Sequence, residues 1–237
     1  MVSMNGELIE SLRKGCIISC QALPDEPLFG AQYMAAMAYA AETGGAVAIR
    51  SNTPVDIRAI KEHCSLPVIG LYKKDYPGFD VYITPTIAEV REVAAAGADF
   101  VAVDATRRPR PDGVPLSGLL ARIRDEFPDL AVVADVSTFE EGVAAMELGV
   151  ELGSTTMSGY TAYSPKLEGP DIELVERLAA LNRTPVLAEG RIWTVEECSA
   201  CFRAGAHAVV IGTAITRPQE ITKRFVAAAE RTFIRQK

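Results

Sequence analysis

The sequence predicts an α/β fold, a closed (β/α)₈ barrel, and three observations lead to it. Eight short apolar runs alternate with segments of helical character along the 237 residues. A weak repeat of helix, glycine and strand recurs at 94–104, 146–155 and 202–212. Five of the runs end on a charged residue: Arg50, Lys73, Asp104, Asp135 and Glu189. Eight alternating units favour a closed barrel over an open sheet.

The apolar runs are the predicted strands. A buried parallel strand reads as an unbroken run of Val, Ile and Ala, because both of its faces are covered. The runs lie at 17–20, 47–50, 68–73, 100–104, 131–135, 151–156, 185–190 and 208–213. An unpaired charge is costly inside such a layer, so a charged residue marks where a strand leaves the core. In this barrel that end is the C-terminal rim, where active sites are built.

Helices are predicted between the strands from composition and from capping residues. They cover 30–42, 54–62, 87–96, 117–126, 138–147, 171–181, 194–203 and 217–230. Four N-caps are predicted, at Thr86, Thr138, Asp171 and Thr194. Glu141 and Glu197 stand three residues after the last two threonines, which is the spacing of a capping box. A glycine then closes each repeated helix just before its strand.

Composition indicates one domain over residues 1–237. The length is close to the roughly 250 residues typical of this barrel, and no linker divides the chain. A net charge of −7 argues against nucleic acid and anionic membranes as partners. The start has no signal-peptide core, and no apolar run approaches the roughly 18 residues of a spanning helix. Five cysteines fit reduced thiols in the cytoplasm, and Cys198 and Cys201 have no second pair for zinc.

Strand order places two charged residues opposite each other. Lys73 ends the third predicted strand and Glu189 the seventh, four positions apart in a ring of eight. Groups on both sides of a bound molecule can take a proton from one face of a carbon and return one to the other. Lysine serves as a base when burial or a neighbouring cation, here Arg50 or Lys74, lowers its pKa. Structural roles stay open: Lys73 could be solvated, Glu189 could pair with Arg191, and both aspartates could support the rim.

Two loops add a second signal. Gly190 follows the seventh strand, and Gly212 and Thr213 follow the eighth, with a helix beginning near Arg217. Loops at these two places commonly hold phosphate in this fold through exposed backbone N–H groups. Gly212 could instead serve close packing alone. The arginine-rich stretch 104–113 could face solvent, reach the rim or contact a neighbouring subunit.

Nine motifs form one ordered set from about residue 15 to residue 225. They are SCQALPDEPL, GAVAIRSN, PVIGLYKKDYP, DVYITPT, VDATRRPRPDG, ADVST, GSTTMSGYT, AEGRI and AITRPQEITKRF. In this order they resemble the bacterial N-acetylmannosamine-6-phosphate 2-epimerases. The resemblance implies a TIM barrel of the ribulose-phosphate-binding type and a cofactor-free isomerase. Such an enzyme interconverts N-acetylmannosamine 6-phosphate and N-acetylglucosamine 6-phosphate in sialic-acid degradation, and we expect a cytoplasmic homodimer.

The resemblance also implies which residues form the site. Catalysis falls on Lys73 and Glu189. Substrate contacts fall on Gln21, Arg50, Asp135 and Arg217. Thr155 is a further candidate for substrate binding, and Gly190, Arg191, Gly212 and Thr213, in the loops described above, are the candidates for phosphate binding. The chain departs from the more usual Gly-Gly-Ala of the eighth loop, where it has Gly212-Thr213-Ala214. A threonine keeps the backbone N–H and adds a hydroxyl, so phosphate binding is still expected.

The implied chemistry is proton exchange at C2 of the sugar. The C2 proton is acidic only beside a carbonyl, so the ring must first open to the C1 aldehyde. A cationic neighbour would then stabilise the negative oxygen of the enolate. Two other functions stay open. A class I aldolase would use a Schiff-base lysine, although Thr155 and Thr156 occupy the sixth strand, where that lysine is commonest. A sugar-phosphate sensor would bind without exchange.

Overall fold

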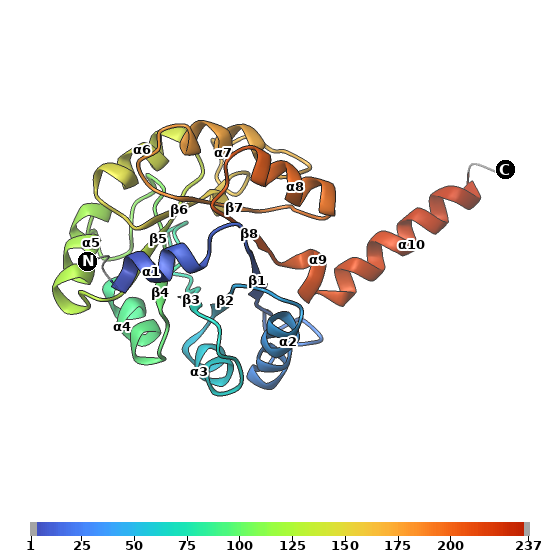
Figure 1. The fold of residues 1–237 in the computed structure, drawn as a ribbon, viewed down its shortest axis with the longest axis horizontal. Helices are drawn as coiled ribbons and strands as arrows, with labels where there is room; N and C mark the ends of the chain where they lie inside the picture. The colour runs from blue at the N-terminus through green and yellow to red at the C-terminus, as the bar shows by residue number, and fades with distance from the viewer. Residues whose placement is uncertain (1–3, 235–237) are drawn as a thin grey trace.

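The computed structural model describes residues 4–234 and shows eight parallel strands closed into a barrel with helices around it (Figure 1). Strands pair in chain order, and the last closes on the first through the register Ile17↔Val210. The strands are β1 Cys16–Cys20, β2 Ala48–Asn52, β3 Val68–Leu71, β4 Phe100–Asp104, β5 Ala131–Asp135, β6 Leu152–Ser154, β7 Val186–Glu189 and β8 Ala208–Ile211. The predicted (β/α)₈ TIM barrel is confirmed.

Helices alternate with the strands, and most of them cover the outside of the barrel (Figure 1). They are α1 Met4–Ser11, α2 Ala31–Thr43, α3 Pro54–His63, α4 Ile87–Ala95, α5 Leu116–Glu126, α6 Phe139–Glu147, the 3₁₀ turn η1 Thr155–Met157, α7 Ile172–Ala179, α8 Val195–Arg203, α9 Thr213–Thr216 and α10 Pro218–Ile234. All four predicted N-caps accept a backbone N–H, and Thr138 and Thr194 form the predicted capping boxes. Between residues 4 and 234, no helix is long and apolar enough to cross a membrane.

Side chains alternate along each strand between two apolar layers. Ile17, Phe100 and Leu187 belong to the cluster that fills the barrel. Their strand neighbours, such as Ile18 and Val101, pack against the surrounding helices. Both layers are almost free of solvent contact, and burial of this apolar surface, about 25 cal/mol per Å², is the main stabilising contribution. The period of two therefore decides which residues face the inside of the barrel.

Helix α1 is a part of the fold that the sequence patterns did not predict. It lies across the barrel in Figure 1. Its residues Leu8 and Ile9 pack on the interior cluster, and Leu12, just beyond it, is fully buried in that cluster. The imidazole Nε2 of His207 lies 2.8 Å from the carbonyl oxygen of Ile9. The helix thus covers the interior apolar layer at the end of the barrel where β8 begins.

Four predicted strand ends were wrong by two residues each, among them that of β8, which ends at Ile211 and not at 213. Strand β2 continues past Arg50 to Asn52, because the Arg50 guanidinium is paired inside the barrel and does not end the strand. Strand β3 ends at Leu71, so Lys73 lies beyond it, in an isolated bridge with Ile83. Strand β6 ends at Ser154, before η1. The last predicted helix is also divided, into α9 and α10.

The arginine-rich stretch folds onto the rim. Arg108 Nη2 lies 2.6 Å from Asp104 Oδ2, at the end of β4. Arg110 is buried and donates to the carbonyl oxygens of Pro85 and Asp104. These two arginines therefore stabilise the loop after β4 rather than forming a solvent-facing segment.

Candidate active site

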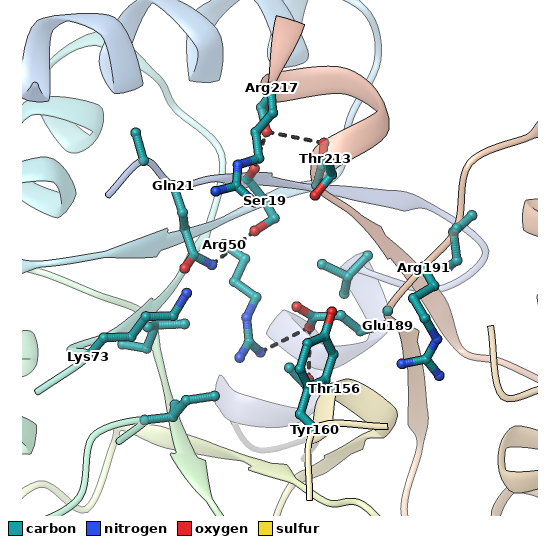
Figure 2. A pocket seen from close by; sticks show the side chains of 18 of the residues that line it. Ser19, Gln21, Arg50, Lys73, Thr156, Tyr160, Glu189, Arg191, Thr213 and Arg217 are labelled. Carbon is teal, nitrogen blue, oxygen red and sulfur yellow. Dashed lines mark hydrogen bonds and ion pairs between the residues drawn. The ribbon is translucent and has the colours of Figure 1, made fainter. Parts of the chain in front are cut away.

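A cavity of about 370 Å³ lies at the C-terminal ends of the strands. Figure 2 shows its polar side chains converging from several strands. The predicted site residues that line it are Gln21, Arg50, Lys73, Glu189, Gly190, Arg191, Gly212, Thr213 and Arg217. Asp135 and Thr155 do not line it. The charged residues at strand ends are thus gathered at one end of the barrel, as predicted.

The two-residue period explains why these side chains meet. Ala48 and Leu187 belong to the interior cluster, and the next interior positions on their strands are Arg50 and Glu189. Lys73 follows Leu71 at the same spacing. On other strands the interior position becomes polar in the same way, at Ser19, Asp104, Asp135 and Ser154. The barrel is therefore apolar through most of its height and polar at its C-terminal end.

A buried ion pair joins opposite walls of the barrel. Arg50 on β2, only 1% exposed, pairs at two points with Asp135 on β5, at 2.6 Å (Nη2–Oδ2) and 3.1 Å (Nη1–Oδ1). Arg50 Nη1 also lies 3.2 Å from Glu189 Oε2. Burial disfavours the arginine charge, but the two carboxylates outweigh it and raise the pKa of Arg50. Asp135 is fully buried, so its direct role is to hold Arg50.

The Glu189 carboxylate contacts the side chains of Thr156 and Arg50. Thr156 Oγ1 lies 3.0 Å from Glu189 Oε2 and 2.7 Å from Asp135 Oδ1. Burial raises the pKa of Glu189, and the Asp135 charge acts in the same direction, while Arg50 opposes both. Thr155 instead bonds the backbone of Glu189, with its hydroxyl 3.0 Å from both the carbonyl oxygen and the amide nitrogen. Thr156, which the sequence analysis did not select, is therefore the threonine that lines the cavity.

Lys73 faces Glu189 across the cavity, with Arg50 between them (Figure 2). Its backbone N–H donates to Asn52 Oδ1 at 2.8 Å, which fixes the chain just after β3. Burial lowers the pKa of Lys73, and the Arg50 charge lowers it further. Lys74 does not contribute, because its ammonium pairs with Glu89 at 3.1 Å. Lowering the lysine pKa and raising the glutamate pKa brings the two values together, as reversible proton exchange requires.

The loops after β7 and β8 form one end of the cavity. Gly190 has φ +112°, a conformation that side-chain-bearing residues rarely adopt. A Cβ on Gly212 would lie 3.2 Å from Ser19 Cβ, so glycine permits close packing there as well. Thr213 and Arg217 lie together at this end in Figure 2. The Arg191 guanidinium donates through Nε to the carbonyl oxygen of Gly169 and through Nη1 to that of Ser158, which anchors this side chain to the loop after η1.

Some cavity residues were missed by the sequence analysis. They are Ser19, Tyr82, Thr156, Tyr160 and Trp193, among others. Ser19 carries a usable signal, since it is in phase with the interior position Ile17 on β1, whereas Thr156 lies in η1, beyond the end of β6, where the strand period no longer applies. Burial raises the pKa of Tyr82 to about 12, so its hydroxyl stays protonated at neutral pH. That hydroxyl contacts Met157 Sδ at 3.8 Å, a weak acceptor, and is available to a ligand.

Comparison with known proteins gives a consistent result. Residues 34–231 match the family described as "Putative N-acetylmannosamine-6-phosphate epimerase". A relative of that description, a 2-epimerase from Caldanaerobacter subterraneus, is 56% identical over 99% of this chain and 97% of its own length. Another, from Enterobacter sp., is 46% identical over 94% of this chain and 96% of its own length.

Solved structures of similar proteins support the same family and the same fold. The N-acetylmannosamine-6-phosphate 2-epimerase from Clostridium perfringens superposes with a TM-score of 0.90 at 44% identity, over 93% of this chain and 96% of that one. Thiamine phosphate pyrophosphorylase from Pyrococcus furiosus has a TM-score of 0.57 at 17% identity, over 89% of this chain and 93% of that one, and shares the fold alone. The chain therefore belongs to the N-acetylmannosamine-6-phosphate epimerase family.

Proposed function

We propose that the protein interconverts N-acetylmannosamine 6-phosphate and N-acetylglucosamine 6-phosphate by removing and returning the C2 proton. One observation carries the proposal: Lys73 and Glu189 face each other across a cavity, and burial displaces their pKa values toward each other. The names of the relatives fix the substrate class. A place in sialic-acid degradation remains the expectation from the sequence resemblance.

The open-chain aldehyde makes the C2 proton acidic. One of the two residues takes that proton, the C2–H electron pair forms the C1–C2 double bond, and the carbonyl π pair moves onto the C1 oxygen to give an enolate. The other residue then delivers a proton to the opposite face of C2, and the aldehyde is regenerated. The charge of Arg50 stabilises the negative oxygen, because a preorganised donor acts most strongly where charge develops. Arg50 Nε and Gln21 Oε1 are buried and have no hydrogen-bond partner within residues 4–234, and in this proposal the bound substrate supplies one.

The phosphate belongs at the Gly190–Gly212 end in this proposal. Backbone N–H groups of Gly190, Gly212 and Thr213, together with Arg217, supply the donors that an anion needs. Without the phosphate these donors would lose their charged partner.

The proposal is tested with phosphorylated and unphosphorylated substrate. N-acetylmannosamine 6-phosphate should be converted in the absence of any added cofactor, with both epimers followed by NMR. The value of kcat/KM for free N-acetylmannosamine should be lower by roughly 100-fold or more, since a hydrogen bond to a charged group contributes about 1.5–3 kcal/mol. Equal kcat/KM values for the two sugars would remove the phosphate site from the account.

The pH dependence of kcat/KM follows from the two displaced pKa values of the substrate-free protein. The active pair carries one proton, so kcat/KM should be bell-shaped. The pKa of Glu189 is raised, so the acid limb should lie above 4.5, and that of Lys73 is lowered, so the alkaline limb should lie below 10.5. Initial rates at substrate concentrations well below KM measure these limbs, which belong to the coupled pair. A kcat/KM that does not change between pH 4.5 and 10.5 would contradict the prediction.

A homodimer is also part of the proposal, and α10 supports it. The helix projects away from the barrel in Figure 1. No side chain of residues 218–232 is buried, and Phe225 is 74% exposed. Since helices in proteins are stabilised mainly by packing of an apolar face, α10 needs a partner, and a second copy of the chain is the one we propose.

The dimer prediction is tested by light scattering. The wild-type protein should have twice the 25.4 kDa mass of the chain at micromolar concentration. Phe225→Ser together with Val226→Ser removes the exposed apolar surface of α10 and should shift the protein toward the monomer. Glu230→Gln, on the same helix and also exposed, is the control and should stay dimeric. A monomeric wild-type protein would overturn this part of the proposal.

Four further properties are proposed for the protein. We expect the barrel to span the whole chain as one domain, the reaction to need no cofactor or metal, and nucleic acid not to be a partner. We expect a cytoplasmic location, in keeping with five free cysteines.

A further inference from the structure

An acidic residue of the β1–α2 loop is tied to the proposed phosphate end of the cavity. Glu26 Oε2 lies 3.2 Å from Arg217 Nε, and Glu26 Oε1 contacts Arg217 Nη2. The Glu26 side chain is 11% exposed, and that of Arg217 is 31% exposed. The proposed reaction gives Glu26 no role, and the sequence patterns did not select it.

The form of this ion pair leaves part of the arginine available. A guanidinium has five N–H donors in one plane. Glu26 occupies the edge formed by Nε and Nη2, which fixes the orientation of that plane. Nη1 lies outside this edge. Arg217 lines the cavity beside Gly212 and Thr213, so the free donors belong to the wall where the phosphate is proposed to bind.

The same ion pair also anchors a cavity wall. The loop that carries Glu26 begins with Gln21, Ala22 and Leu23, and all three line the cavity. Leu23 is 42% exposed, so apolar packing holds this part of the loop only partly. The contact from Glu26 to the start of α10 therefore connects the loop with the phosphate end.

We propose that Glu26 is a positioning residue for phosphate recognition, which orients Arg217 so that its remaining N–H groups meet the substrate phosphate. This inference rests on the proposed function, because the phosphate is that of its substrate. Electrostatics alone predicts the opposite effect, since a carboxylate near an anion site repels the anion. The sign of the change on neutralising Glu26 therefore separates positioning from repulsion.

The test compares Glu26→Gln with Asp25→Asn, which removes the same charge from the neighbouring, exposed position. Two quantities are measured: KM for N-acetylmannosamine 6-phosphate and the dissociation constant of inorganic phosphate, obtained from direct binding to the protein. Glu26→Gln should raise both by roughly tenfold, the scale of one charge-assisted hydrogen bond, with kcat changed less than about twofold. Asp25→Asn should change neither constant by more than about twofold. In an Arg217→Ala background, Glu26→Gln should have no further effect.

Glu26→Asp is a second variant that keeps the charge and covers the case in which the glutamine variant folds poorly. It should retain part of the phosphate affinity. Lower constants for Glu26→Gln would show that Glu26 repels phosphate, and unchanged constants would show that it has no role. Either result overturns the inference. If the wild-type protein does not epimerise the sugar, the proposed function fails, while inorganic phosphate binding still tests Glu26 directly.

Discussion

Lys73→Ala and Glu189→Gln should each abolish measurable turnover while leaving the fold and phosphate binding intact. The loss of one acid–base group typically costs a factor of about 10²–10⁴ in rate. Each substitution removes the group that serves one face of C2, and neither residue can complete the inversion alone. The rate losses of the two substitutions should therefore not add, and the rate of the double variant should be close to that of the slower single variant. Steady-state rates measure the loss of turnover, and the dissociation constant of inorganic phosphate, obtained from direct binding, measures whether the phosphate site is retained.

Lys74→Ala is the matched control for the lysine. Its ammonium pairs with Glu89 outside the cavity, so turnover should remain close to the wild-type rate. A Lys73→Ala enzyme that epimerises at nearly the wild-type rate would remove Lys73 from the mechanism.

Proton exchange without epimerisation is expected of one of the two single variants, Lys73→Ala or Glu189→Gln. That variant should still exchange the C2 proton of one epimer with solvent, without forming the other epimer.

Asp135→Asn should destabilise the protein by about 3–5 kcal/mol, the scale measured when one partner of a buried ion pair is removed. Asp135 is fully buried, and Arg50 would then keep a buried charge with only Glu189 beside it. The substituted side chain is nearly the same size, so the loss would come from charge rather than from a cavity. Urea unfolding of wild-type and variant protein measures the change in the free energy of unfolding.

The paired variant Arg50→Met with Asp135→Leu separates charge from packing. Both charges are removed together, so much of the lost stability should return, because apolar replacement of a buried ion pair is often neutral or stabilising. Activity should not return, since the cation between Lys73 and Glu189 is gone. If Asp135→Asn lowers the free energy of unfolding by less than about 1 kcal/mol, the Arg50–Asp135 ion pair is not a main stabilising contact of the site.

The fold was predictable because its signals are local. Each strand is a short apolar run, each capping box spans four residues, and Thr138 and Thr194 behave as their sequence predicts. The site was predictable to the extent that it follows the strand ends. Lys73 and Glu189 face each other because their strands are four apart in a closed ring, which strand counting alone provides.

The contacts between distant segments were not predictable in the same way. Nothing in the local sequence pairs Arg50 with Asp135, because this contact crosses the barrel interior between strands that are not neighbours. Thr155 was selected and Thr156 was not, and the sequence does not show which of the two threonines lines the cavity. The sixth strand was predicted to run to residue 156, but β6 ends at Ser154 and the 3₁₀ turn η1 sets the directions of both side chains. Helix α1 lies before the first barrel strand, outside the repeat that identified the other helices.

The most direct test of the central claim is entry of deuterium at C2 during the reaction in D₂O, followed by NMR. In this mechanism the proton removed from one face is not the one returned to the other, and both Lys73 and Glu189 exchange with solvent. The account predicts that N-acetylglucosamine 6-phosphate formed from N-acetylmannosamine 6-phosphate carries solvent deuterium at C2. Epimerisation that yields product without deuterium at C2, or binding with neither exchange nor epimerisation, would contradict it.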